Sequence, residues 1–96
     1  MYRKLSRQEI AQLEAQGCSA HEWADVEVAE GFDPHYVKNA HFSGRNRLGA
    51  FRREISLPGG LLVHSGIYNA TLHNVEVGDD AHLYNIQLQS RSKLLP

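Results

Sequence analysis

The chain has 96 residues, of which 42% are hydrophobic and 22% are charged, as in ordinary globular domains. Ten Lys and Arg residues against eleven Asp and Glu residues give a formal net charge of −1, which excludes a strongly basic surface for nucleic acid or for an anionic membrane. The single cysteine excludes an intramolecular disulfide framework, and no apolar run approaches the roughly 20 residues that span a bilayer.

The N-terminus has no visible targeting signal. Residues 1–6 contain two basic residues, but no apolar segment follows them as it would in a secretory signal. We therefore expect a cytoplasmic protein with no nucleic-acid partner and no membrane partner.

The first helix is predicted from a capping box. Ser6 and Glu9 are spaced so that each side chain can bond to the other's backbone N–H, which predicts a helix over about residues 7–16. Gly17 suits the left-handed residue that ends a helix. Cys18 follows the helix C-terminus, where the helix dipole does not favour a thiolate, so we expect an inert thiol.

Further start signals follow within residues 1–36. Ser19 and Glu22 repeat the capping-box spacing and predict a second helical piece. Residues 26–28 alternate like a strand, and Asp33 before Pro34 predicts one short helical turn. We interpret residues 1–36 as a helical cap and lead-in to the remainder.

A six-residue pattern recurs four times after residue 36. Its order is apolar, any, Asn, small or apolar, any, apolar, and its asparagines suit turns because Asn tolerates a left-handed backbone. The four copies cover residues 37–42, 67–72, 72–77 and 83–88.

These repeats predict a mainly β fold in which short parallel strands stack as a solenoid. Aliphatic residues at gaps of five or six do not follow a helical period. We expect coils over residues 37–88 and an irregular tail over 89–96. A pentapeptide-repeat solenoid is the structural alternative.

The length of one coil stays open between two registers. A coil of about 16 residues stacks Asn69 on Asn85, whereas a coil of about 18 residues, made of three hexapeptides, brings His64 near His82.

A set of short motifs in the first 82 residues carries a family resemblance. The motifs are residues 2–5, 9–10, 13–14, 17–18, 42–44, 57–60, 64–67, 70–74 and 77–79. Over about residues 1–82 the chain resembles the N-terminal segment of an uncharacterised family of large proteins from gut Bacteroidetes, which have a domain of unknown function. The resemblance implies a left-handed parallel β-helix of the trimeric hexapeptide-transferase type, and a role in sugar or nucleotide-sugar metabolism. Such proteins continue for many more coils, so we expect a truncated fragment here.

Histidine is the candidate catalytic residue type, because hexapeptide acyltransferases commonly use a His as general base. His64, in a loop beside Ser65, is the preferred candidate, and His73 is the second. A surface His without a task is the simpler alternative. His64, His73 and His82 are nine residues apart, which places neighbours on different faces of a three-sided coil, so we expect neither a metal site nor a cofactor.

A local basic cluster is the candidate site for a phosphate or phosphosugar. A solvated basic face is the alternative, given the near-neutral chain and the adjacent Glu54. The cluster consists of Arg45, Arg47, Arg52 and Arg53.

Two functions follow from these patterns. The first is a structural module, formed by the cap and first coils of a β-helix protein, that associates with itself as a homo-oligomer. The second is part of a hexapeptide-type acyltransferase or a nucleotidyltransferase-like enzyme that acts on a sugar or nucleotide sugar. We expect no enzymatic activity from this chain alone.

Overall fold

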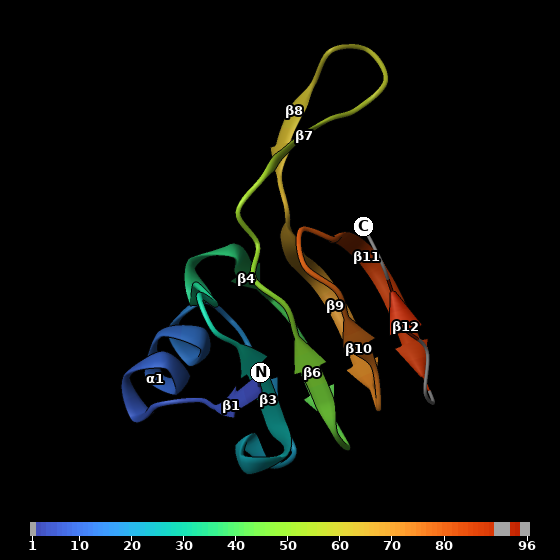
Figure 1. The fold of residues 1–96 in the computed structure, drawn as a ribbon. Helices are drawn as coiled ribbons and strands as arrows, with labels where there is room; N and C mark the ends of the chain where they lie inside the picture. The colour runs from blue at the N-terminus through green and yellow to red at the C-terminus, as the bar shows by residue number, and fades with distance from the viewer. Residues whose placement is uncertain (1, 90–92, 95–96) are drawn as a thin grey trace.

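The computed structural model describes residues 2–89 and 93–94. In these residues the chain forms one α-helix, two 3₁₀ helices and twelve short strands (Figure 1). The helices are α1 (Arg7–Ala15), η1 (Trp23–Asp25) and η2 (Pro34–Tyr36). The strands are β1 (Tyr2–Lys4), β2 (Ser19–Ala20), β3 (Val26–Ala29), β4 (Val37–Lys38), β5 (His41–Ser43), β6 (Asn46–Leu48), β7 (Glu54–Ser56), β8 (Leu62–His64), β9 (Gly66–His73), β10 (Glu76–Val77), β11 (His82–Gln89) and β12 (Lys93–Leu94). None of the helices in this part of the chain is long and apolar enough to cross a membrane.

The strands form two five-stranded sheets and one hairpin. The first sheet has the order β1-β3-β6-β10-β12 and is parallel except for the antiparallel pair β1–β3. The second sheet has the order β11-β9-β5-β2, with β4 also paired to β9, and all of its pairs are parallel. The hairpin β7–β8, which we call the arm (residues 54–64), is antiparallel and projects from the sheets (Figure 1).

The predicted helical cap followed by coils of a left-handed β-helix is wrong. Coils of one length need a constant sequence spacing between paired residues. In the second sheet, however, Leu83 pairs with Ile67, whereas the partner of Thr71 is His41, which lies nearly twice as far back along the chain. The antiparallel strand β1 and the inserted arm also do not belong to such a coil, and the pentapeptide alternative fails for the same reason.

The repeat does predict which residues pair. The copies at 37–42, 67–72 and 83–88 lie side by side in the second sheet, whereas the copy at 72–77 contributes β10 to the first sheet. Between β9 and β11 the shorter of the two expected registers is present, because His82 pairs with Gly66 and not with His64. The repeat thus marks which residues become strands but does not fix the lengths of all the connections.

The asparagine turns are confirmed. Asn39, Asn69, Asn74 and Asn85 all have a left-handed backbone, with φ between 52° and 55°. An asparagine in this conformation bends the chain at equivalent points of successive strands, because its short side chain lowers the cost of positive φ.

Local signals in residues 1–36 are only partly confirmed. The capping box of Ser6 and Glu9 is present, and Gly17 has φ of 88° after α1. The second predicted capping box, at Ser19 and Glu22, is wrong because Ser19 lies in β2. The 3₁₀ helix η1 begins instead after Glu22, whose side chain accepts a hydrogen bond from the Ala24 N–H. The short turn at residues 34–36 and the strand at 26–29 are both present.

One hydrophobic core joins both sheets and α1. Leu13 of α1 packs with fully buried aliphatic residues from the first sheet, such as Val28, and from the second, such as Leu72. Residues 1–36 supply strands to both sheets, so the N-terminal segment shares this core. Of the predicted tail, residues 90–92 and 95–96 lie outside the described residues, and β12 pairs with β10.

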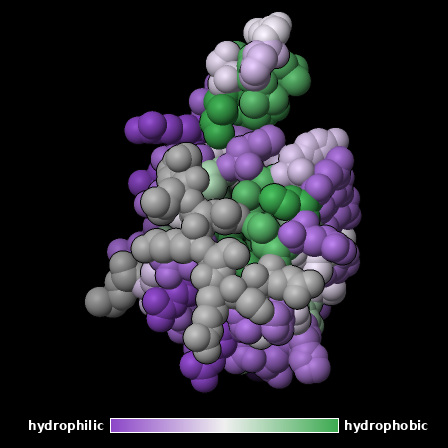
Figure 2. Space-filling model, turned by 90° about the vertical axis from the view of Figure 1, so that its right-hand side faces the viewer, coloured by the Kyte–Doolittle hydropathy of each residue, from purple (hydrophilic) through white to green (hydrophobic). Residues whose placement is uncertain are grey.

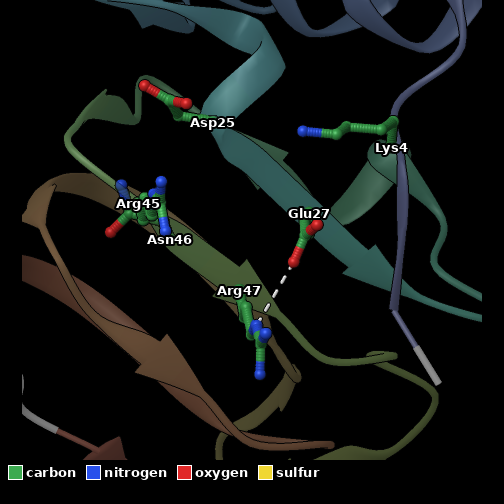
Figure 3. A pocket seen from close by; sticks show the side chains of 6 residues that line it. All are labelled: Lys4, Asp25, Glu27, Arg45, Asn46 and Arg47. Carbon is green, nitrogen blue, oxygen red and sulfur yellow. Dashed lines mark hydrogen bonds and ion pairs between the residues drawn. The ribbon is translucent and has the colours of Figure 1, made fainter.

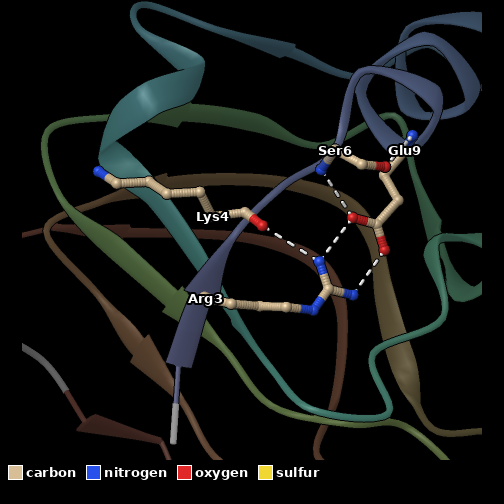
Figure 4. A network of polar contacts seen from close by, with 4 residues as sticks. All are labelled: Arg3, Lys4, Ser6 and Glu9. Atoms are coloured by element: carbon tan, nitrogen blue, oxygen red, sulfur yellow. Dashed lines mark hydrogen bonds and ion pairs between the residues drawn. The ribbon is translucent and has the colours of Figure 1, made fainter.

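An ion pair connects β1 to the start of α1 (Figure 4). The two terminal nitrogens of Arg3 each donate to a carboxylate oxygen of Glu9 at 2.8 Å, and the Ser6 backbone N–H donates to the same carboxylate. The hydrogen bond from Arg3 is the main reason why the pKa of Glu9 falls from 4.5 to about 2.

Replacement of Glu9 by Gln is expected to remove a pH-dependent part of the stability. Because the folded-state pKa of Glu9 is below its unfolded value, the charged pair stabilises the fold above about pH 4.5, and this contribution is lost as the pH falls towards 2. Arg3 is 42% exposed, so solvent screening limits the difference at pH 7 to about 1 kcal/mol. Urea unfolding of both proteins between pH 2 and pH 7 measures it, and a difference that does not change with pH would contradict the assignment.

Candidate functional site

A groove lies between the arm and the second sheet. Its volume is about 520 Å³, within the range of small-molecule sites. The arm contributes mostly aliphatic side chains, and the sheet contributes aromatic, imidazole and amide side chains. Its lining residues are Lys38, Asn39, Leu57, Leu61, Val63, His64, Tyr68, Asn69, His82 and Tyr84.

His64, the preferred candidate base, lies in this groove at the end of β8. Its ring is stacked on that of Tyr36, with centroids 3.6 Å apart and planes 8° apart. Its Nδ1 is 2.7 Å from the Ser65 carbonyl oxygen. Because a carbonyl oxygen only accepts, Nδ1 bears the proton, and in the neutral ring Nε2 has the lone pair. Nε2 has no hydrogen bond to any residue that the structure describes.

The segment beside His64 is fixed where the arm joins the second sheet. Ser65 is fully buried, its N–H donates to the Arg53 carbonyl at 2.7 Å, and its hydroxyl accepts from the Arg53 N–H at 3.2 Å. Gly66 follows, and a Cβ there would collide with the Tyr36 carbonyl oxygen, so the backbones of η2 and β9 approach closely only because residue 66 is glycine. These contacts hold the groove-facing residues of β8 in place.

Tyr68 is a half-buried phenol in the groove lining. Its hydroxyl donates to the His64 carbonyl oxygen at 3.2 Å, and burial raises its pKa. The Tyr68 ring lies 5.6 Å from that of His82, which in turn lies 6.4 Å from that of Tyr84. The sheet side of the groove is therefore a row of rings.

His73, the second candidate base, lies elsewhere, at the end of β9. Its Nδ1 is 2.8 Å from the Ser43 hydroxyl and its Nε2 is 3.1 Å from the Asn74 side-chain nitrogen. Because the amide nitrogen only donates, Nε2 accepts and Nδ1 donates. Both ring nitrogens of His73 are thus occupied by protein groups.

The four candidate arginines do not share one site. Arg45 and Arg47 line a depression of about 310 Å³ against Lys4, Asp25 and Glu27 (Figure 3). Arg47 pairs with Glu27 at 3.2 Å, and the two acidic residues offset much of the positive charge in this depression.

Arg52 and Arg53 face other acceptors. A terminal nitrogen of Arg52 donates to the Glu30 carbonyl oxygen at 3.3 Å, and Arg53 pairs with Asp80 at 3.6 Å. Asp80 also accepts from the Arg52 backbone N–H at 2.8 Å. Within the described chain, no three His, Cys, Asp or Glu side chains are grouped closely enough to hold a metal ion.

Sequence reasoning missed the residues that make the groove. Lys38, Tyr68 and Tyr84 occupy the second position of three repeat copies and pair in register across β4, β9 and β11. Their shared position in the repeat is the signal that could have identified them, because equivalent residues of paired copies lie in one row across the sheet. The arm side could not be anticipated, since nothing in the repeat says how residues 54–64 fold back.

Comparisons with known proteins identify a family but no activity. An uncharacterised protein of Treponema pallidum (strain Nichols) is 31% identical over 84 residues, which are 88% of this chain but 12% of that protein. The chain therefore spans about one eighth of the length of this relative. No solved structure matches. Residues 2–92 match the family model described as "Domain of unknown function (DUF4954)", and the chain belongs to that family.

Proposed function

We propose that this domain is a non-catalytic module that pairs with a second copy of itself through the outer edge of β8. The observation that supports it is the apolar edge of the arm, which pairs with no further strand among the residues that the structure describes. Leu61 and Leu62 are 61% and 60% exposed, which is unusual for two adjacent leucines. Figure 2 shows apolar side chains on the arm, at the top of the view.

Leu62 differs from its neighbours along the chain. Leu61, Val63 and His64 line the groove, whereas the exposed Leu62 does not. Among the described residues the arm pairs only within itself, through Glu54–His64, Ile55–Val63 and Ser56–Leu62. A two-stranded hairpin is marginal in water, so a further strand would stabilise it.

A second copy is the occupant that fits this edge. A two-fold axis relates equivalent strands antiparallel, so β8 of each copy can extend the other's hairpin to a four-stranded antiparallel sheet centred on Leu62. A head-to-tail contact through the second sheet would instead join strands of unequal length, the eight-residue β11 and the two-residue β2. The paired surface is small, so we expect a weak, reversible dimer.

Sedimentation velocity over a concentration series tests the pairing. We expect the sedimentation coefficient of the wild type to rise at high micromolar concentration, and the Leu62→Asp variant to remain monomeric because the charges would oppose each other across the axis. Ser56→Asp, on the exposed face of β7, is the matched control and should behave as the wild type does. A monomeric wild type at millimolar concentration, or an unaffected Leu62→Asp variant, would refute the proposal.

A second candidate function is a transferase-type site, acting on a sugar or nucleotide sugar, in which His64 is the general base. The contact of Nδ1 with the Ser65 carbonyl supports it, because it orients the ring and leaves the basic lone pair on Nε2. A thermal shift with an acyl-coenzyme A donor that disappears in His64→Gln but persists in His35→Gln would favour this candidate. The absence of any shift in the wild type would contradict it.

A further inference from the structure

The groove between the arm and the second sheet differs from the depression around Arg45 in its acidic side chains. Among the described residues, its lining includes Lys38 and the imidazoles of His64 and His82, but no Asp or Glu. The depression around Arg45 includes both an aspartate and a glutamate. An anion in the groove would therefore meet no carboxylate from these lining residues.

The groove also has two apolar walls of different kinds. On the sheet side are the rings of Tyr68 and Tyr84, of which Tyr84 is 56% exposed. On the arm side are the aliphatic side chains of Leu57, Leu61 and Val63. A slot between an aromatic and an aliphatic wall suits a flat ring, which can stack on one wall and pack against the other.

The ammonium group of Lys38 and the exposed ring of Tyr84 belong to residues at opposite ends of one row across three strands. Lys38, Tyr68 and Tyr84 are in register on three neighbouring parallel strands. Adjacent strands are about 4.8 Å apart, so the backbones of Lys38 and Tyr84 are separated by about 10 Å. A ligand whose ring and anionic group are separated by a short linker can span this row.

Asparagine and imidazole groups supply the remaining polar contacts. Asn39 and Asn69, both with left-handed backbones, follow Lys38 and Tyr68 at the rim. Nε2 of His64 has no hydrogen bond to the described residues, and it accepts when neutral or donates when protonated. These groups can bond to hydroxyl or phosphate oxygens between the two ends of the row.

We propose that this groove binds a small molecule that joins a planar ring to a phosphate group, with the ring against Tyr84 and the phosphate at Lys38. This proposal depends neither on pairing of the arms nor on His64 acting as a base. Adenosine monophosphate, which has both parts, is the probe. Adenosine and inorganic phosphate each supply one part, and glucose 1-phosphate replaces the planar ring by a saturated one.

Titration calorimetry and chemical-shift mapping on the intact chain test the groove. We expect adenosine monophosphate to bind at least tenfold more tightly than the other three probes and to shift the amide signals of Tyr68 and His82. Lys38→Gln and Tyr84→Ser, both at exposed positions, should each weaken binding about tenfold, whereas Tyr84→Phe should preserve it.

Arg45→Gln is the matched control, because Arg45 is an exposed cation outside the groove. It should leave binding unchanged. The proposal is overturned if adenosine monophosphate does not bind at millimolar concentration, or if Arg45→Gln weakens binding as much as Lys38→Gln does. Equal affinity for glucose 1-phosphate and adenosine monophosphate would contradict the claim that the ligand needs a planar ring.

Discussion

Replacement of Leu72 by alanine is expected to lower the free energy of unfolding by about 3 kcal/mol. Leu72 is fully buried at the centre of the second sheet, in register with Phe42 on one side and Leu88 on the other. Removing its branched side chain leaves a cavity between strands that cannot close without moving their neighbours. This loss is a large part of the stability of a small domain.

Equilibrium urea unfolding of the Leu72→Ala variant measures the loss. Thr71→Ala is the matched control, because Thr71 is the preceding residue of β9 and its side chain is exposed. We expect the control to change the stability by less than about 0.5 kcal/mol. Similar losses for the two variants would show that β9 does not present Leu72 to the core.

Replacement of Asn46 by alanine is expected to cost about 2–3 kcal/mol. Asn46 is fully buried in β6, where its side-chain oxygen accepts from the Val75 N–H at 2.9 Å and its side-chain nitrogen donates to the Ser43 carbonyl at 3.0 Å. Alanine leaves the Val75 N–H without this partner, so its desolvation is no longer offset by a hydrogen bond to Asn46. The Ser43 carbonyl loses one of two donors, since it also accepts from the Asn74 N–H at 3.2 Å.

Gln87→Ala provides the comparison for Asn46, since Gln87 is an exposed amide on β11. Removal of the Gln87 amide should leave the midpoint of urea unfolding unchanged within the experimental error of the wild-type value. If Asn46→Ala were as stable as Gln87→Ala, the buried contacts between β6 and the segment at Val75 would not exist in solution.

Sequence patterns predict the strands of this protein better than their arrangement. The aliphatic positions Ile67, Leu72, Val77 and Leu83 are buried, as the repeat predicts. The asparagine turns are equally local, since a left-handed backbone favours few residue types. Such signals do not depend on the rest of the chain.

The arrangement depends on distant contacts that no short motif records. The capping-box spacing at Ser19 indicated a helix, but pairing of Ser19 with His41 of β5 holds that residue in a strand. Strands β5 and β9 pair although the whole arm is inserted between them in the sequence, and no repeat length can anticipate such an insertion. Tertiary pairing therefore overrides the local preference.

In the candidate site, too, local features are predicted from the sequence and the spatial arrangement is not. The residue type of His64 and its flanking residues make it a candidate base, and the structure places it in the groove lining. Proximity in sequence predicts one arginine cluster, but Arg45 and Arg53 have different surroundings because β6 ends between them. Nearness in sequence predicts nearness in space only within one element.

Disulfide cross-linking at the arm tests the proposed pairing most directly. In a β8–β8 pair centred on Leu62, the two Leu62 Cβ atoms face each other across the axis at about 5 Å, close enough for a disulfide after a small adjustment. The native thiol of Cys18 is buried, and burial raises its pKa, so it should not compete. Under mild oxidation we predict that Leu62→Cys forms a covalent dimer in high yield, whereas Ser56→Cys on β7 does not. A Leu62→Cys protein that stays monomeric, or equal cross-linking of the two variants, would contradict the proposed pairing.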